Sequence, residues 1–334
     1  MNVLIFANPF SGHGPNRKRV GQLEAALEAR GVDVRVVWQP QERIATLRQV
    51  QGDDTVVVAA GGDGSIADVV NDMNTADRLG LRFATLPVGN ENLFAQEFGF
   101  TLKAEPMAEA IARGEARPID LVRVRSVVPG DGNPSSASGA DGDRSAAADS
   151  AAAERPDEEP PVDRLLTLMV STGFDADVVH RMDRWRRGLP DGQLHRVGKK
   201  SYVVRTLDAI RRYRYPGVTV VADGKRYTGH QAYVFNLPRY GGGLKFAPDA
   251  RGDDQQLDWL VFERPGFLRL LGYHGLVVLG RHSRAKTVAA GRASHVTLLP
   301  ADGQPVPTQA DGDPVGHTPL DLTVLPGALR VIAV

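Results

Sequence analysis

Short apolar runs alternate with glycine-rich turns and helical patterns over the N-terminal third of the chain. Each run has the length of a strand, and residues 55–60 are almost continuously apolar, as in a strand buried on both faces of a parallel sheet. Strands that alternate with helices pair in parallel through right-handed crossovers. The pattern therefore predicts an open parallel α/β sheet. The expected strands are residues 2–7, 34–38, 55–60 and 82–86, and the expected helices include residues 20–27, 66–73 and 93–98.

The pattern changes after residue 119 to a series of short β-type runs with few helices between them. Serial strands of this kind are typical of an antiparallel β-sandwich or barrel. We therefore predict an α/β domain over residues 1–122 and a β-rich, sandwich-like domain over residues 123–334. The expected strands of the second domain are residues 121–127, 165–171, 218–222, 231–236, 257–262, 295–299 and 320–324, with helices at residues 202–213 and 267–279.

Residues 129–161 interrupt the second domain with a segment rich in Ser, Ala, Gly, Asp and Pro. Such a composition buries too little apolar surface to offset the entropy of ordering the chain. We predict a disordered insertion without a function of its own.

Composition and charge narrow the classes of function. The 334 residues favour two domains, at roughly 150 residues each, and the 40 basic and 40 acidic side chains cancel. No overall field therefore attracts nucleic acid. The absence of cysteine excludes disulfides and thiolate chemistry. The longest apolar stretch, residues 266–280, is interrupted by Arg269 and His274 and is shorter than the ~20 residues that cross a bilayer. We expect a cytoplasmic protein, able to contact the inner face of a membrane peripherally and compatible with a homo-oligomer.

Three glycine-rich turns follow strands of the first domain and precede helices, with the sequences NPFSG, GGDGS and PVGNEN at residues 8–12, 61–65 and 87–92. In a Rossmann-like open sheet such turns converge at the carboxyl ends of the strands, where helix N-termini and free N–H groups bind phosphate. Neither the P-loop nor the dinucleotide fingerprint is present. For any one turn taken alone, the glycines are equally well explained by the backbone geometry of the turn, without a bound nucleotide.

Asp63 lies among glycines in the second turn. A carboxylate beside bound phosphate is repulsive unless it meets Mg²⁺ or takes a proton from an attacking hydroxyl. Its alternative role is to cap the following helix, although Ser65 is better placed for that. We therefore predict a catalytic role for Asp63.

These residues resemble a known family. The string VVAAGGDGS at residues 57–65 closely resembles the GGDGT signature of the diacylglycerol kinase catalytic domain, shared with sphingosine and ceramide kinases and bacterial lipid kinases. Residues 8–12 resemble the NPxSG nucleotide turn, and residues 87–95 resemble PxGTxNDxA. The later motifs GfdAxV, YGGGxxxaPxA, DGxLD and DGE have their likenesses at residues 173–178, 240–250, 254–258 and 311–313.

The resemblance implies an ATP- and Mg²⁺-dependent kinase that transfers the γ-phosphoryl group to a lipid hydroxyl, such as that of diacylglycerol, at a membrane surface. It implies that Asp311 is the general base on the substrate hydroxyl and that Asp63 contacts the metal ion. It also implies that Asp254, with nearby backbone carbonyls, resembles a structural magnesium site of the bacterial members. The implied nucleotide-binding positions are Asn8, Pro9, Ser11, Gly12, Gly61, Gly62, Asp63, Gly64, Ser65, Gly89, Asn90, Asn92 and Asp313.

Three residues depart from the family pattern: Asn90 stands for Thr, Gln255 for Gly and Asp313 for Glu. These departures leave open a nucleotide-binding protein that has lost catalysis. A kinase for a soluble hydroxyl compound or for NAD is the other alternative, because NAD kinases also contain a GGDG sequence.

A basic stretch runs from Arg181 to Arg214 and contains few acids. It is either a solvated helical face or a contact with anionic lipid headgroups. The histidines are scattered, and no pair has the spacing of metal ligands. The chain also lacks the G-x-S-x-G sequence of serine hydrolases, so we do not expect that activity.

Overall fold

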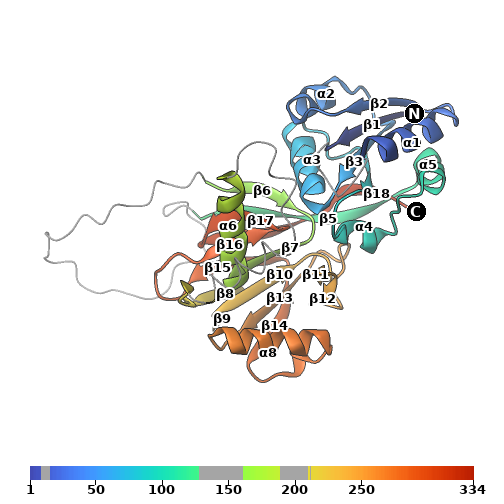
Figure 1. Ribbon diagram of the computed structural model, residues 1–334. Coiled ribbons are helices and arrows are strands. Elements are labelled where there is room, and N and C mark those ends of the chain that lie inside the picture. Colours follow the sequence, from blue (N-terminus) through green and yellow to red (C-terminus); the bar gives the residue numbers. More distant parts are fainter. Residues whose placement is uncertain (9–15, 128–160, 189–209, 211) are drawn as a thin grey trace, which may run out of the picture.

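The structure is a computed structural model that describes residues 1–8, 16–127, 161–188, 210 and 212–334. Residues 129–160 of the predicted insertion at 129–161, and most of the predicted helix at residues 202–213, therefore lie outside the described residues. Figure 1 shows two halves, an N-terminal α/β half that contains both chain termini and a β-rich half with helices on its outside.

The N-terminal half is a parallel sheet with the strand order β2-β1-β3-β4. All seven residues of β3 are buried, as its apolar run predicts. The strands agree with the predicted ranges to within one residue at each end. They are β1 (Asn2–Ala7), β2 (Asp33–Val37), β3 (Thr55–Gly61) and β4 (Arg82–Pro87). The helices are α1 (Asn16–Glu28), α2 (Arg43–Gln49, preceded by the 3₁₀ turn Pro40–Glu42), α3 (Asp63–Thr75), α4 (Leu93–Phe98) and α5 (Ala104–Arg113).

One long C-terminal strand, β18 (Leu320–Ile332), continues this sheet into the second half. Its end pairs in parallel with β4, and it pairs antiparallel with β5 (Ala116–Ser126) on both sides of an irregularity between Leu325 and Leu329. A ten-stranded sheet therefore runs through both halves of the described chain, and the predicted boundary at residue 122 falls within β5. The remaining strands of this sheet are β6 (Asp163–Leu166), β8 (Val218–Ala222), β9 (Lys225–Gly229) and β15 (His295–Pro300).

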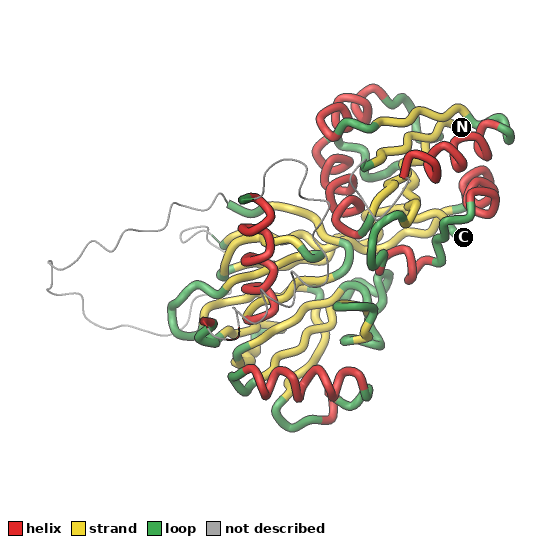
Figure 2. Tube along the Cα trace, in the orientation of Figure 1, coloured by secondary structure: helices red, strands yellow, loops and turns green. Residues whose placement is uncertain are grey.

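A second, six-stranded antiparallel sheet packs against the C-terminal part of the first, in the order β14-β13-β10-β7-β16-β17. Figure 2 shows the two layers of strands with helices outside them. Branched aliphatic side chains of both layers fill the space between the sheets, among them Val122, Val234 and Leu298. The predicted fold class, an open parallel α/β sheet followed by an antiparallel sandwich-like domain, is confirmed.

The strands of the second sheet are β7 (Met169–Gly173), β10 (Gln231–Phe235), β13 (Leu257–Phe262), β14 (Val288–Ala293), β16 (Pro307–Ala310) and β17 (Asp313–His317). The other elements of this half are β11 (Arg239–Tyr240), β12 (Leu244–Lys245), α6 (Phe174–Arg187), α8 (Phe267–Val278) and the 3₁₀ turn His282–Arg284.

The prediction of one strand over residues 165–171 is wrong, because the chain breaks there into β6 and β7. At the break the N–H groups of Thr167, Leu168 and Met169 donate to the carboxylate of Asp311. A distant side chain thus takes donors that a continuous strand would give to its neighbours.

Among the described residues, no helix combines the length and the apolar character needed to cross a membrane.

Candidate active site

The three glycine-rich turns meet at the carboxyl ends of β1, β3 and β4. Asn8, which follows β1, donates its backbone N–H to Ala60 O at 3.1 Å and its side-chain amide to Ser65 Oγ at 3.4 Å. The first turn is therefore joined to the second. Pro9, Ser11 and Gly12, also predicted to bind nucleotide, lie outside the described residues.

The second and third turns touch through their glycine backbones. A Cβ atom at Gly89 would lie 2.3 Å from Gly62 Cα and 2.8 Å from Gly62 N, which no side chain tolerates. Asn92, in a left-handed conformation at φ 54°, accepts the N–H of Gly89 at 3.0 Å and donates to the oxygens of Pro87 and Gly89. Gly62 and Gly89 are glycines because their backbones approach too closely for a side chain. Asn92 is an asparagine because this residue type tolerates a positive φ. Gly61 is buried at the end of β3, and Asn90 is exposed.

Asp63 links the same two turns through its carboxylate. Its two oxygens accept the N–H groups of Leu93 and Phe94, at 2.9 and 3.0 Å, in the first turn of α4. A carboxylate there is favoured by the unpaired N–H groups of the helix start. Asp63 therefore positions α4, a role that the sequence does not predict, because the partner residues are 30 positions away.

Asp311 is buried, with 8% of its surface exposed, and accepts four hydrogen bonds. Its Oδ2 receives the N–H and the hydroxyl of Thr167, at 2.7 and 3.1 Å, and its Oδ1 receives the N–H groups of Leu168 and Met169. A carboxylate has about four lone-pair sites. The structure thus gives Asp311 a structural role, with its acceptors occupied by the chain between β6 and β7, and not the accessible lone pair that a general base requires.

Asp313, two residues further on, lies across the boundary from the second glycine turn. Its Oδ2 is 3.9 Å from the position of a Cβ atom at Gly64 and 3.9 Å from the guanidinium of Arg164, and its side chain is 44% exposed. Asp313 is therefore the acid of the 311–313 motif that faces both halves and remains accessible.

The three carboxylates share one electrostatic environment. Burial raises the pKa values of Asp63, Asp311 and Asp313, and the negative charge of Asp311 raises the pKa values of the other two further. Backbone N–H groups oppose this rise at Asp63 and Asp311, and Arg164 opposes it at Asp313. The charge of Asp311 thus acts on an acid of the second glycine turn as well as on Asp313.

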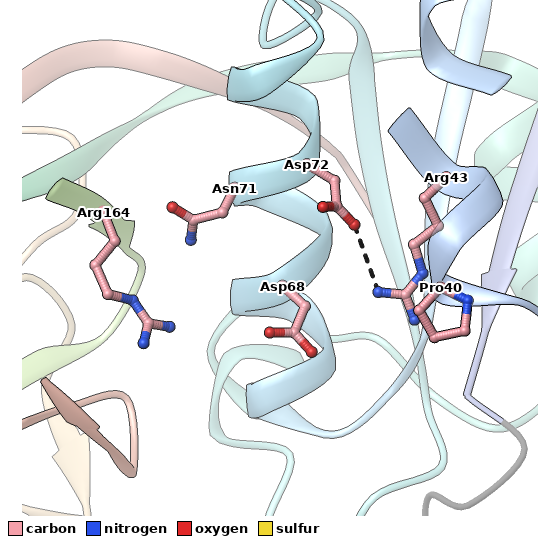
Figure 3. Close-up of a pocket in the computed structure, with 6 residues that line it drawn as sticks. All are labelled: Pro40, Arg43, Asp68, Asn71, Asp72 and Arg164. Carbon is pink, nitrogen blue, oxygen red and sulfur yellow. Dashed lines mark ion pairs between the residues drawn. The ribbon is translucent and has the colours of Figure 1, made fainter. Parts of the chain in front are cut away.

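A cleft of ≈ 460 Å³ lies beside α3 and reaches the second half at Arg164. Figure 3 shows Asp68, Asn71 and Asp72 projecting from α3, with Arg164 pointing toward them from β6 and Arg43 on the other side. Asn71 exchanges two hydrogen bonds of 2.8 Å with the backbone of Leu165. The cleft thus lies where Asn71 joins the two halves, next to the Arg164–Asp313 contact.

The sequence does not predict Asp68 or Arg164 as site residues. Asp68 has a signal that could have found it, because it shares a helical face with Asn71 and Asp72. Arg164 has none, since it follows the low-complexity segment and meets Asp313 only in the folded chain.

Two further motifs meet beside the second sheet. Asp175, at the start of α6, accepts hydrogen bonds from Ser171 Oγ at 2.5 Å and from the hydroxyl of Tyr240 at 2.8 Å. Helix α6 also pairs Arg181 with Asp177 and Arg187 with Asp183, each at 2.6 Å. Part of the basic stretch is therefore neutralised within its own helix.

Asp254 does not fit the magnesium site that the resemblance implies. Its Oδ2 forms an ion pair with Arg292, which also lies 3.5 Å from Asp258, and its Oδ1 accepts the N–H of Gln256. Mg²⁺ needs several oxygen ligands in a regular octahedron. Here the guanidinium of Arg292 pairs with the carboxylate that would bind the ion. The described residues also contain no group of three acidic or histidine side chains that could hold a metal ion without backbone carbonyls.

Comparison with known proteins agrees with this architecture. Residues 2–124 match the diacylglycerol kinase catalytic domain, and residues 168–333 match the YegS C-terminal NAD kinase beta sandwich-like domain. A diacylglycerol kinase of Mycobacterium tuberculosis is 25% identical over 99% of this chain and 94% of its own length, and one of Bacillus subtilis is 21% identical over 88% and 84%. A crystal structure of a diacylglycerol kinase from Bacillus anthracis has a TM-score of 0.63 at 14% identity, covering 100% of this chain and 97% of the other, and shows the same fold.

The fold and the arrangement of motifs define a two-domain protein of the lipid kinase class. The chain belongs to the diacylglycerol kinase catalytic domain family and carries the YegS-type C-terminal domain of its bacterial members.

Proposed function

We propose that this protein transfers the γ-phosphoryl group of ATP to the hydroxyl of a lipid, with diacylglycerol as the first candidate. The observation that carries the proposal is the position of Asp313, an accessible acid opposite Gly64 in a glycine turn of the other half. Positioning and charge stabilisation account for most of the catalysis in phosphoryl transfer, and an interdomain cleft supplies both.

We assign the general-base role to Asp313 in place of Asp311. The Asp313 carboxylate accepts the proton of the lipid hydroxyl while the hydroxyl oxygen forms its bond to the γ-phosphorus, and the bond from that phosphorus to the bridging oxygen of ADP breaks. Asp311 holds the β6–β7 backbone, and Asp63 holds α4 against the second turn, so that the turns keep their shape. Arg164 lowers the pKa of Asp313 and favours the ionised form that a base needs.

The donor set at the boundary suits a magnesium ion that arrives with ATP. Mg²⁺ is normally held by one or two carboxylates together with phosphates and water. Asp313 is accessible, and each oxygen of Asp63 accepts one hydrogen bond and keeps a lone pair, so either acid would supply such a carboxylate. When bound, the ion supplies positive charge to the phosphates in an acidic region.

The test is a labelled-ATP assay on diacylglycerol in mixed micelles, with wild type, Asp313→Asn and Asp223→Asn. Asp223 is an exposed acid in a turn with φ 50°, which Asn also adopts, and it serves as the matched control. We expect labelled lipid from wild type and Asp223→Asn, and a loss of about a hundredfold or more with Asp313→Asn. Transfer to NAD or to soluble alcohols without any lipid product would reject the proposal.

A further inference from the structure

Helix α8 carries the most exposed apolar side chains of the described residues. The exposed fractions are 79% for Leu268, 58% for Leu271, 65% for Val278 and 66% for Leu279, just after the helix, and no other large apolar side chain in the described part of the chain exceeds 48%. At 3.6 residues per turn these positions lie on one face of the helix. The outward face of α8 is therefore a continuous apolar stripe.

The opposite face of α8 is also apolar. Leu270, Tyr273 and Val277 are buried, and the ring of Tyr273 stacks on Phe262 of β13 with centroids 4.5 Å apart. A helix with apolar side chains on two opposite faces is normally covered on both of them. Yet α8 lies on the outside of the second half, at the end of the molecule away from α1 and α2 (Figure 1).

Two glycines lie on the outward face, at positions 272 and 275. A Cβ atom at Gly272 or Gly275 would have no neighbour within 4 Å, so packing against the described residues does not require glycine there. Glycine inside a helix lowers its stability. What the two glycines provide is a flat face that another surface can approach closely.

Exposed cations lie within α8 and on both sides of it in the chain. The segment 263–287 contains one acidic residue, Glu263, and the ion pairs found among the described residues include none of its arginines or its lysine. Self-association of two such faces would bring like charges together, whereas an anionic surface complements them. The exposed cations are Arg264, Arg269, Arg281, Arg284 and Lys286.

We propose that α8 and its flanking cations form a docking surface for an anionic lipid bilayer, on which the helix lies in the interfacial plane with its outward leucines among the acyl chains. The proposal extends the proposed function, because a lipid kinase must reach a substrate held in a membrane. Phe267, at the start of α8, contacts Phe174 with ring centroids 6.0 Å apart, and Asp175 follows directly. The docking helix is thus connected to the motifs beside the second sheet.

The test is co-sedimentation with phosphatidylcholine vesicles that contain either no phosphatidylglycerol or about 30% of it, a fraction chosen to give a strong negative surface potential. Wild type should bind the anionic vesicles and bind more weakly as NaCl rises, because salt screens the cations. The variant Leu268→Ser with Leu271→Ser should lose at least about tenfold in binding for each leucine. Arg281→Gln with Arg284→Gln should lose about fivefold for each arginine.

Matched controls come from the N-terminal half. Leu102→Ser removes an exposed leucine elsewhere, and Arg48→Gln with Lys103→Gln removes two exposed cations, so both should bind as wild type does. Equal binding to neutral vesicles, or leucine variants that bind like wild type, would overturn the proposal. A third contrary result would come from sedimentation velocity. If wild type were a dimer and the leucine variants were monomers that bind vesicles as wild type does, the face would join two copies of the chain.

A kinase assay separates this proposal from the proposed function. With a short-chain diacylglycerol below its micelle concentration, the Leu268→Ser, Leu271→Ser variant should match wild type, and on anionic vesicles it should lose most of its rate. If neither wild type nor the variant phosphorylates any lipid, the proposed function fails. The vesicle-binding experiment still shows whether α8 is a docking surface.

Discussion

Two acidic clusters in this protein are balanced in different ways. Near β13 and β14, Asp254 and Asp258 share the guanidinium of Arg292. At the boundary between the halves, Asp63 and Asp311 are held by backbone N–H groups, and Asp313 faces Arg164 at 3.9 Å. Arg292 forms ion pairs with both acids of the first cluster, whereas in the described residues Arg164 pairs with only one acid of the second, Asp313. Backbone dipoles stabilise carboxylates without cancelling their charge, so the boundary cluster can still attract an incoming cation or accept a proton.

Asp313→Asn gives the strongest test of this contrast. We expect kcat to fall by about 10²–10⁴-fold, because the amide cannot accept the hydroxyl proton. The free energy of unfolding should change by less than about 0.5 kcal/mol, since the side chain is 44% exposed and its ion pair is long. Assay rates and urea unfolding measure the two effects, and a variant that keeps the wild-type rate would show that the boundary cluster has no reactive member.

Asp311→Asn should show the reverse behaviour in stability. The amide NH₂ would face backbone N–H groups, so buried donors of Thr167 or Leu168 lose their acceptor, at a cost of about 3 kcal/mol in the free energy of unfolding. Urea unfolding beside Asp313→Asn, its neighbour in the same motif, makes the comparison direct. Equal stability of the two variants would contradict the structural role of Asp311.

Arg292→Gln tests the internally balanced cluster. Removal of the guanidinium leaves Asp254 and the largely buried Asp258 to repel each other. We expect a loss of about 1 kcal/mol in unfolding free energy, small because Arg292 is 46% exposed. Thermal unfolding with and without MgCl₂ measures it. The variant should recover part of the loss in MgCl₂, while wild type unfolds at the same temperature with Mg²⁺ or with a chelator. A wild type destabilised by the chelator would show that Arg292 does not replace a metal ion.

Arg164→Gln should produce the smallest change, a shift in the pH profile. Arg164 lowers the pKa of Asp313, which burial raises. Without the cation this pKa rises further, the carboxylate is protonated at a higher pH, and the acid limb of kcat/KM moves upward. Arg125→Gln, on the neighbouring strand β5, is the matched control and should leave the limb in place. A downward shift of the acid limb would show that Asp313 is not the group whose ionisation controls the rate.

The periodic patterns predicted the fold better than they predicted the site. The four apolar runs of the first half match β1 to β4 because a strand buried on both faces requires local, continuous hydrophobicity. Strand β18 was predicted only over residues 320–324, although it continues to Ile332 and pairs with β4 and β5. Its length depends on partners more than 200 residues away in the chain, which a local pattern does not contain.

Sequence patterns are enough to predict the α/β and sandwich halves and the three glycine turns, with acids at residues 63, 311 and 313. These features depend on local composition and on short motifs. Which acid is accessible depends on the folded chain. Asp311 meets its donors at Thr167–Met169, and Asp313 meets Arg164, through contacts between residues about 140–150 positions apart. Hydrogen-bond saturation is a property of neighbours in space, so the same residue type two positions apart acquires a structural role in one case and an exposed, titratable position in the other.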